Sequence, residues 1–492
     1  MLFSSYPFIF AFLPITLIGY FFLSRQWGKE PAIAWLVVCS LTFYSWWNPH
    51  YLALLSASII INYLMGKALA KSPRKKLLVF GVALNLLALG YYKYANFFVD
   101  NVNSLFDSHI YLQEIILPLA ISFFTFQQIA FLVDAYRGEA EEYSFLHYCL
   151  FVTFFPQLIA GPIVHHKEML PQFSDQDSFS FKHSDFAIGS TIFTFGLFKK
   201  VVIADQLAPF ANVVFNTAAN GELLSSADAW AGTIAYSLQL YFDFSGYSDM
   251  AIGLALLFGI RLPLNFHSPY KALNIIDFWR RWHMTLSRFL RDYLYIALGG
   301  NRKGSVRRYI NLSATMLLGG IWHGAGWQFF IWGAMHGIFL VINHFWHHIK
   351  PQSFEQQESF LLAFSGRFLS RLLTLFCVLV AWVFFRASDT ATALDMLQAM
   401  FSLSEAGFVL TDKGDWLNIV AVGSVIALFL PNTQQLMARY KPVLLNSGFT
   451  LSQTERFWKW QPNIFWAGAI TALFIWSMSR MTGVSEFLYF QF

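Results

Sequence analysis

The sequence predicts an all-α polytopic membrane protein. Of its 492 residues, 56% are hydrophobic and only 12% are charged, and the mean hydropathy is +0.48. The 55 Phe and 17 Trp residues suit helices in lipid whose ends carry aromatic belts. The polar breaks between the apolar runs are too short to hold a soluble module. We therefore expect a single integral-membrane domain over residues 1–492.

Apolar runs of membrane-spanning length recur along the whole chain. Residues 7–24 are about long enough to cross a ~30 Å hydrocarbon core and lack a cleavage site, which predicts an uncleaved first helix. Because Pro, Gly or charge interrupts several runs, we expect roughly 10 to 13 full spans. The further candidate spans are 32–48, 51–70, 77–98, 113–134, 144–160, 187–215, 229–259, 308–321, 327–348, 367–386, 416–431 and 463–480.

The charges in the short loops predict the orientation. Lys and Arg gather in residues 25–29 and 71–76, whereas the loop at 99–112 has neither. The positive-inside rule then places the two basic loops in the cytoplasm and the N-terminus outside. The net charge of +5 is small and the basic clusters are juxtamembrane, so nothing indicates a nucleic-acid partner.

A basic amphipathic segment follows residue 274. Projected as one helix over residues 275–294, it places His283 on the apolar face. The segment is too polar to span lipid, so we expect it at the cytoplasmic interface or as a re-entrant element. The opposite face carries Arg280, Arg288 and Arg291.

Glycines surround a second histidine, in the segment MLLGGIWHGAGWQFFIWGAMHG at residues 316–337. Such glycines let a helix break and let backbone or substrate approach His323 closely. A lone histidine on an apolar face is usually a core residue with its N–H satisfied. Two buried histidines in one region, one of them at a glycine-rich break, favour chemistry for His323. Trp322 and His336 are candidate lining residues.

Two acids lie in the apolar segment QLYFDFSGYSDMAIG at residues 239–253. Asp243 and Asp249 each cost several kcal/mol at membrane depth unless they are paired or face water. Their spacing of six residues puts them 120° apart on a helix, so they do not form a simple carboxylate dyad. Contact with substrate and pairing with loop arginines both remain open.

The chain ends in a short aromatic segment, GVSEFLYFQF, at residues 483–492. One reading is an interfacial anchor. The other is an acyl relay, because the Tyr489 hydroxyl can accept an acyl group. The three cysteines lie in apolar runs, and the sequence predicts neither a disulfide framework nor a metal site.

Together these motifs resemble the membrane-bound O-acyltransferase (MBOAT) family, and within it the bacterial alginate and peptidoglycan O-acetylation proteins. The resemblance implies a ring of tilted helices around a thinned core, with core motifs at 150–348. It also implies that His323 is catalytic and that His283 belongs to the same inner site. The motifs are FPQLIAGPIV at 155–164, YFDFSGYSDMAIG at 241–253, FWRRWHMTLSRFLRDYLYIALGG at 278–300, GGIWHGAGWQFFIWGAMHG at 319–337 and FLYFQF at the end.

The implied activity moves an acyl group, most simply acetyl, from a cytoplasmic donor across the bacterial inner membrane for O-acetylation of an exported polysaccharide or peptidoglycan. Acetyl-CoA is the expected donor, as a substrate and not a tightly bound cofactor. Arg280, Arg288 and Arg291 are the candidate donor-binding residues, because arginines suit its phosphates. A neutral His323 can take a proton from a hydroxyl or carry the acyl group. We expect it at the floor of a cavity that opens to both faces.

The expected partner is an extracytoplasmic SGNH-type acyltransferase or esterase-like protein. Within the family, the alternative is D-alanyl transfer to teichoic acid. A different class is a polysaccharide transporter or flippase, which needs a wide polar pathway and often inverted repeats, and the sequence indicates neither. A purely structural scaffold would not require acids and histidines at membrane depth.

Overall fold

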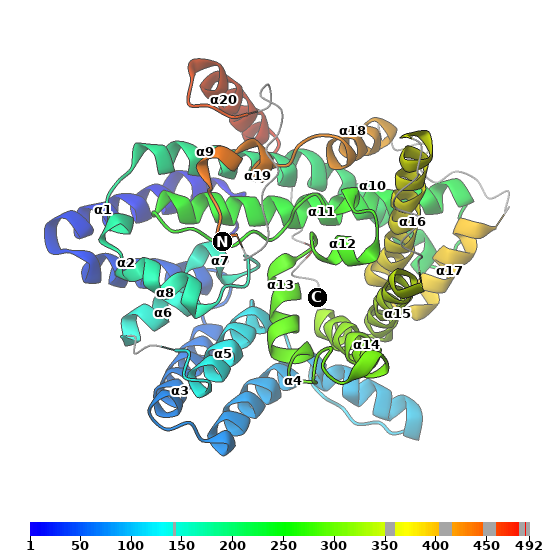
Figure 1. Cartoon of the computed structure of the whole chain (residues 1–492), viewed down its shortest axis with the longest axis horizontal. Coiled ribbons are helices and arrows are strands. Elements are labelled where there is room, and N and C mark those ends of the chain that lie inside the picture. Colours follow the sequence, from blue (N-terminus) through cyan, green and yellow to red (C-terminus); the bar gives the residue numbers. More distant parts are fainter. Residues whose placement is uncertain (141–143, 350–359, 403–415, 446–458, 482–487, 489–492) are drawn as a thin grey trace. The chain divides into compact units, whose positions relative to one another are not determined.

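A computed structural model of the chain, drawn in Figure 1, consists of helices joined by loops in the part that is described. The described residues are 1–140, 144–349, 360–402, 416–445, 459–481 and 488. They contain no strand, only an isolated parallel bridge between Pro263 and Leu444. The all-α prediction is confirmed.

The chain divides into two compact units, each built from three separate stretches. The first comprises Met1–Phe198, Gly246–Leu264 and Thr433–Val484, and the second comprises Lys199–Ser245, Asn265–Asn432 and Ser485–Phe492. The single integral domain expected from the sequence stays a prediction.

Six helical stretches of the described chain are long and apolar enough to cross a membrane. Their outward side chains include Ile18, which is 71% exposed, and Leu87, which is 70% exposed. Large apolar residues in such numbers face lipid, because water would penalise them. The prediction of a multi-pass membrane protein is therefore confirmed. The stretches are Phe8–Trp27, Tyr51–Lys71, Lys75–Phe106, His183–Ala219, Trp327–Ile349 and Ser365–Arg386.

Helices of the first unit join through buried amides. Asn62 of α3 and Asn85 of α4 exchange two hydrogen bonds of 3.2 and 2.7 Å, and Gln128 of α5 donates to Ser58 of α3 at 2.8 Å. Such bonds help to hold helices together where lipid offers no partner. The helices of this unit are α1 (Leu13–Trp27), α2 (Lys29–Ser45), α3 (Tyr51–Lys71), α4 (Lys75–Phe106), α5 (Ile121–Tyr136), α6 (Phe145–Thr153), α7 (Phe155–Leu158), α8 (His166–Ser174), α9 (His183–Phe198), α19 (Thr433–Leu436) and α20 (Ile464–Ser479).

Two predicted spans of this unit are wrong in their bounds. The run at 113–134 becomes helical only at Ile121, because the chain before it turns through Ala120 with a left-handed φ of 61°. The run at 144–160 breaks after Thr153 and restarts at Phe155 as the short α7. Pro156 stands in the first turn of α7, where its missing N–H costs nothing, and it could not continue the preceding helix.

The second unit holds the histidine segments. Its α14 and α15 form a tight hairpin, because Gly320 and Gly333 let the two backbones touch: a Cβ on Gly320 would lie 2.4 Å from the Phe329 carbonyl oxygen. The elements of this unit are η3 (Lys199–Ala204), α10 (Asp205–Ala219), η4 (Pro269–Lys271), α12 (Ile275–Trp279), α13 (Met284–Phe289), η5 (Leu290–Tyr295), α14 (Gly304–His323), α15 (Trp327–Ile349), α16 (Phe360–Arg386), α17 (Thr390–Phe401) and α18 (Trp416–Leu428). Helix α11 (Ser226–Leu257) contributes residues to both units.

Candidate active site

His323 is the last residue of α14, and the glycine-rich break predicted after it is present. The chain becomes extended at Gly324, and α15 starts at Trp327. A side chain at position 324 is excluded, because its Cβ would lie 2.1 Å from the Phe329 ring. The break therefore leaves the His323 imidazole at a helix end and not in the middle of a packed helix face.

Aromatic rings surround the His323 imidazole. Its centroid lies 4.8 Å from that of Trp322 and 5.1 Å from those of both Trp332 and Phe385. His323 nevertheless keeps 7% of its surface exposed, more than His283 at 1% or His336 at 0%. The Trp322 ring contacts the imidazole. Its role as a lining residue and the cavity open to both faces stay predictions.

His336 lies one helical turn after Trp332 on α15, and the Trp332 ring contacts both His336 and His323. The centroid distances are 4.8 Å from Trp332 to His336 and 5.1 Å from Trp332 to His323. The indole Nε1 of Trp279 donates to His336 Nδ1 at 3.3 Å. Because an indole can only donate, Nδ1 is the acceptor and a neutral His336 carries its proton on Nε2. That buried Nε2–H has no acceptor among the described residues.

His283 is buried as predicted, but the single helix expected over residues 275–294 is wrong. The helix ends at Trp279, the chain turns, and His283 takes a left-handed φ of 41° as the residue before α13. A second irregularity follows at Leu290, where α13 passes into the π-helical η5. Apolar periodicity survives such a turn, so the pattern alone indicated a continuous helix.

Asn265, which the sequence reasoning missed, orients His283. Its Oδ1 lies 3.1 Å from His283 Nδ1 and accepts the Thr285 hydroxyl at 2.9 Å. The backbone N–H of Met284 also donates to the Asn265 carbonyl at 2.9 Å, so the two chain segments are held together here. Because Oδ1 only accepts, His283 Nδ1 carries a proton, and in the neutral ring Nε2 keeps its lone pair. His283 and His336 are thus set as opposite tautomers.

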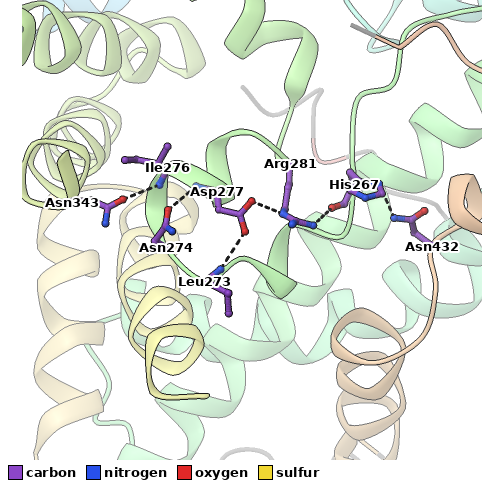
Figure 2. A network of polar contacts seen from close by, with 8 residues as sticks. All are labelled: His267, Leu273, Asn274, Ile276, Asp277, Arg281, Asn343 and Asn432. Atoms are coloured by element: carbon purple, nitrogen blue, oxygen red, sulfur yellow. Dashed lines mark hydrogen bonds and ion pairs between the residues drawn. The ribbon is translucent and has the colours of Figure 1, made fainter. Parts of the chain in front are cut away.

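A polar network holds the turn between α12 and α13, as Figure 2 shows. Asp277 accepts from Arg281 Nε at 2.7 Å and from the Leu273 amide at 3.3 Å, while Asn274 caps α12 by accepting from the Asp277 amide at 2.9 Å. Arg281 reaches the His267 carbonyl at 3.4 Å. The network fixes the backbone immediately before His283 without using His283 itself.

His267 closes one end of this network by contacting Asn432 at 3.2 Å through Nδ1, as drawn in Figure 2. Burial first, and then the nearby charges of Arg281 and Lys271, lower the pKa of His267 to about 4 against the opposing effect of Asp277. The ring is therefore neutral near pH 7. The sequence offered no signal for this role, because the partners of His267 lie far apart in the chain.

His323 and His336 both contact the Trp332 ring, whereas His283 contacts a different set of rings. The His283 ring contacts Phe244 at 4.8 Å and Phe266 at 6.3 Å between ring centroids. The adjacent Trp282 lies 5.0 Å from Trp382, which in turn lies 6.3 Å from His336 and 5.9 Å from Trp332. A series of aromatic contacts thus connects the three histidine segments within the second unit.

The predicted arginine face is not a single face. Arg280 caps the C-terminal end of α12 and is exposed, Arg288 lies in α13 and is half-buried, and Arg291 lies in η5. Arg291 makes a two-pronged contact with Asp292, at 2.7 and 3.1 Å. The break after Trp279 separates Arg280 from the other two, so their joint role in donor binding stays a prediction.

The two acids of α11 have different partners. Asp249 accepts from Thr433 at 2.6 Å and from Gln434 at 3.1 Å, both in the first unit. Asp243 forms an ion pair with Lys200 at 2.6 Å.

Tyr489 lies outside the described residues. No group of three or more His, Cys, Asp or Glu side chains in the described part of the chain could hold a metal ion.

The helices and these buried histidines define a class, a multi-pass membrane protein with a histidine-containing core. The chain belongs to the membrane-bound O-acyltransferase (MBOAT) family, whose model matches residues 10–381. The protein is therefore an O-acyltransferase, and the family resemblance is confirmed.

Three relatives show the range of the family around this chain. A peptidoglycan O-acetyltransferase of Helicobacter pylori is 42% identical across 100% of this chain and 98% of its own length. A probable alginate O-acetylase of Pseudomonas putida is 42% identical over 82% of this chain and 81% of its own. A teichoic acid D-alanyltransferase of Bacillus subtilis is 28% identical over 46% of this chain and 59% of its own.

Proposed function

We propose that the protein moves acetyl groups from cytoplasmic acetyl-CoA across the bacterial inner membrane for O-acetylation of an exported polysaccharide or peptidoglycan, with its N-terminus outside. The observation that carries the proposal is the full-length match, at 42% identity, to a peptidoglycan O-acetyltransferase. The match to a probable alginate O-acetylase supports acetyl as the group that is transferred.

His323 is the residue that acts on the reacting atoms in this proposal. The acceptor hydroxyl oxygen forms a bond to the acetyl carbon as the C–S bond of the thioester breaks. The hydroxyl proton passes to the imidazole and from there to the leaving thiolate, or the imidazole first carries the acetyl group itself. His283, whose Nε2 is left as a proton acceptor by the contact between Nδ1 and Asn265, supports the same site. Arg280, Arg288 and Arg291 bind the phosphates of the donor.

The first acceptor in the proposal is either the Tyr489 hydroxyl of the C-terminal segment or a serine of an extracytoplasmic SGNH-type protein, which then modifies the glycan. Replacing Tyr489 with Phe keeps the ring and removes the hydroxyl. Loss of acetyl transfer in Tyr489→Phe supports the relay, and unchanged transfer rejects it.

The test uses the protein in membranes with radiolabelled acetyl-CoA, asking whether label reaches protein or glycan. We expect His323→Ala to abolish transfer while membrane insertion stays intact. The matched control is His348→Ala, at the exposed end of α15, which should transfer at the parental rate. Retained transfer in His323→Ala would overturn the assignment.

D-alanyl transfer remains the second candidate, favoured by the match to a teichoic acid D-alanyltransferase. That match has lower identity and covers less of the chain than the acetyl-transfer relatives. Its donor is a carrier protein, so labelling from acetyl-CoA separates the two. Family membership argues against the transporter and scaffold readings.

A further inference from the structure

A buried ion pair lies within the second unit, away from the histidines in sequence. Lys200 in η3 and Asp243 in α11 approach to 2.6 Å, and each side chain is only 3% exposed. Lys200 also contacts Asp205 at 2.8 Å, whose side chain is 22% exposed. Two carboxylates thus share one ammonium group. Because buried charges are costly unless further hydrogen bonds satisfy them, the second oxygen of Asp243 requires a donor.

The chain's own C-terminal segment supplies that donor. The backbone N–H of Leu488 donates to Asp243 Oδ2 at 3.3 Å, while Oδ1 faces Lys200. Leu488 is 1% exposed. A residue that served only as an interfacial anchor would bury its side chain in lipid and would not need a carboxylate for its amide.

The same face of α11 carries two further polar groups. Tyr236, Gln239 and Asp243 follow a spacing of three and four residues, which aligns them on one side of a helix. Tyr236 and Gln239 are 0% and 2% exposed, and the Tyr236 hydroxyl and the Gln239 Oε1 have no partner among the described residues. Buried polar atoms are nearly always paired, so this strip can bind further polar groups.

We propose that Lys200 and Asp243, beside this strip of α11, form the docking site for the chain's own C-terminal segment at Leu488. Asp243 accepts a hydrogen bond from the backbone N–H of Leu488, and Lys200 forms an ion pair with Asp243 and orients it. Under the proposed relay, the residue that this contact holds is the one before Tyr489. The docking of Leu488 itself does not rest on that relay. Lys200 and Asp243 are accordingly positioning residues and take no part in bond making.

The test measures how accessible position 488 is in the full-length protein. Leu488→Cys is made with Cys149→Ala and Cys377→Ala, and the buried Cys39 is kept as a reporter of the fold. We expect a maleimide to label Cys at 488 at least about tenfold more slowly than in denatured protein, because the site must open before it reacts. Adding Lys200→Met with Asp243→Asn, which removes both charges of the pair, should bring labelling to within about twofold of the denatured rate.

The matched control is Asp249→Asn, an equally buried acid six residues further along α11, which should leave labelling slow. If Cys39 becomes reactive in the double variant, the variant has unfolded, and the single Asp243→Asn change decides instead. Labelling at the denatured rate in the parent, or slow labelling that survives loss of the pair with Cys39 still protected, overturns the proposal. No acyl donor is present in this assay. Failure of the Tyr489 relay would therefore leave the labelling result unchanged.

Discussion

Replacing Asn265 with leucine should lower the activity by releasing the His283 ring, although His283 itself is unchanged. Asn265 Oδ1 is the acceptor for His283 Nδ1 at 3.1 Å and for the Thr285 hydroxyl at 2.9 Å. Removing the acceptor of two buried donors costs roughly 2–6 kcal/mol of folding stability, at about 1–3 kcal/mol for each. The freed ring can exchange tautomers and turn. The site then loses about 1.4–2.7 kcal/mol of the free energy that holds the ring in its reactive orientation, which corresponds to a roughly 10–100-fold fall in kcat/KM.

Two variants separate this loss from general damage. Thr285→Val removes one of the two donors and keeps the contact between Asn265 and His283, so we expect less than about a threefold change in kcat/KM. Asn265→Asp keeps an acceptor for Nδ1 and should retain most of the activity. The assay is transfer from radiolabelled acetyl-CoA, with gel filtration in detergent to confirm the fold. A folded Asn265→Leu protein as active as Thr285→Val would refute the role of Asn265.

Three further changes test the remaining parts of the site. If the buried His336 Nε2–H contacts substrate, His336→Phe should lower kcat/KM by about 100-fold while His336→Gln, which keeps an N–H nearby, loses less; equal losses would contradict this. Gly320→Ala should destabilise the hairpin by about 1–3 kcal/mol in thermal unfolding, because its Cβ would lie 2.4 Å from a backbone oxygen, whereas Gly319→Ala, with its nearest contact at 3.4 Å, should not. The depressed pKa of His267, about 4, means that the unfolded chain takes up this proton first, so stability should fall by about 3 kcal/mol as the pH drops from 6.5 to 4. His267→Asn, which cannot titrate, should flatten that part of the pH profile.

Much of the architecture was predictable because lipid imposes long apolar helices. The hairpin of α14 and α15 and the break after His323 followed from glycines, whose lack of a Cβ is a local property of the sequence. Bounds failed where the cause was a backbone turn inside an apolar run, as at Ala120 and Phe154. Hydropathy is blind to such turns, since the residues on both sides remain equally apolar.

The histidine site shows the same division. Burial of His283 was predictable from periodicity, but its partner Asn265 precedes it by 18 positions and lies in an unremarkable stretch of chain. Nothing local indicates that contact, because it depends on how two segments meet after the turn at residues 280–283. The tautomers of His283 and His336 were likewise beyond the sequence, since each is set by the one atom that faces Nδ1.

The two aspartates of α11 differ in the side chains that contact them, and these partners indicate which acid has a functional role. Both are acids in one apolar helix, and the sequence treats them alike. Asp249 is satisfied by two neutral side chains, Thr433 and Gln434, which need no counter-charge. Asp243 instead brings Lys200 into the interior and presents its other oxygen to the C-terminal segment. A second buried charge is an expense that a purely structural contact could avoid with a neutral pair. We therefore expect Asp243→Asn to lower acetyl transfer far more than Asp249→Asn at equal protein yield, and equal transfer rates in the two variants would show that both acids serve only the fold.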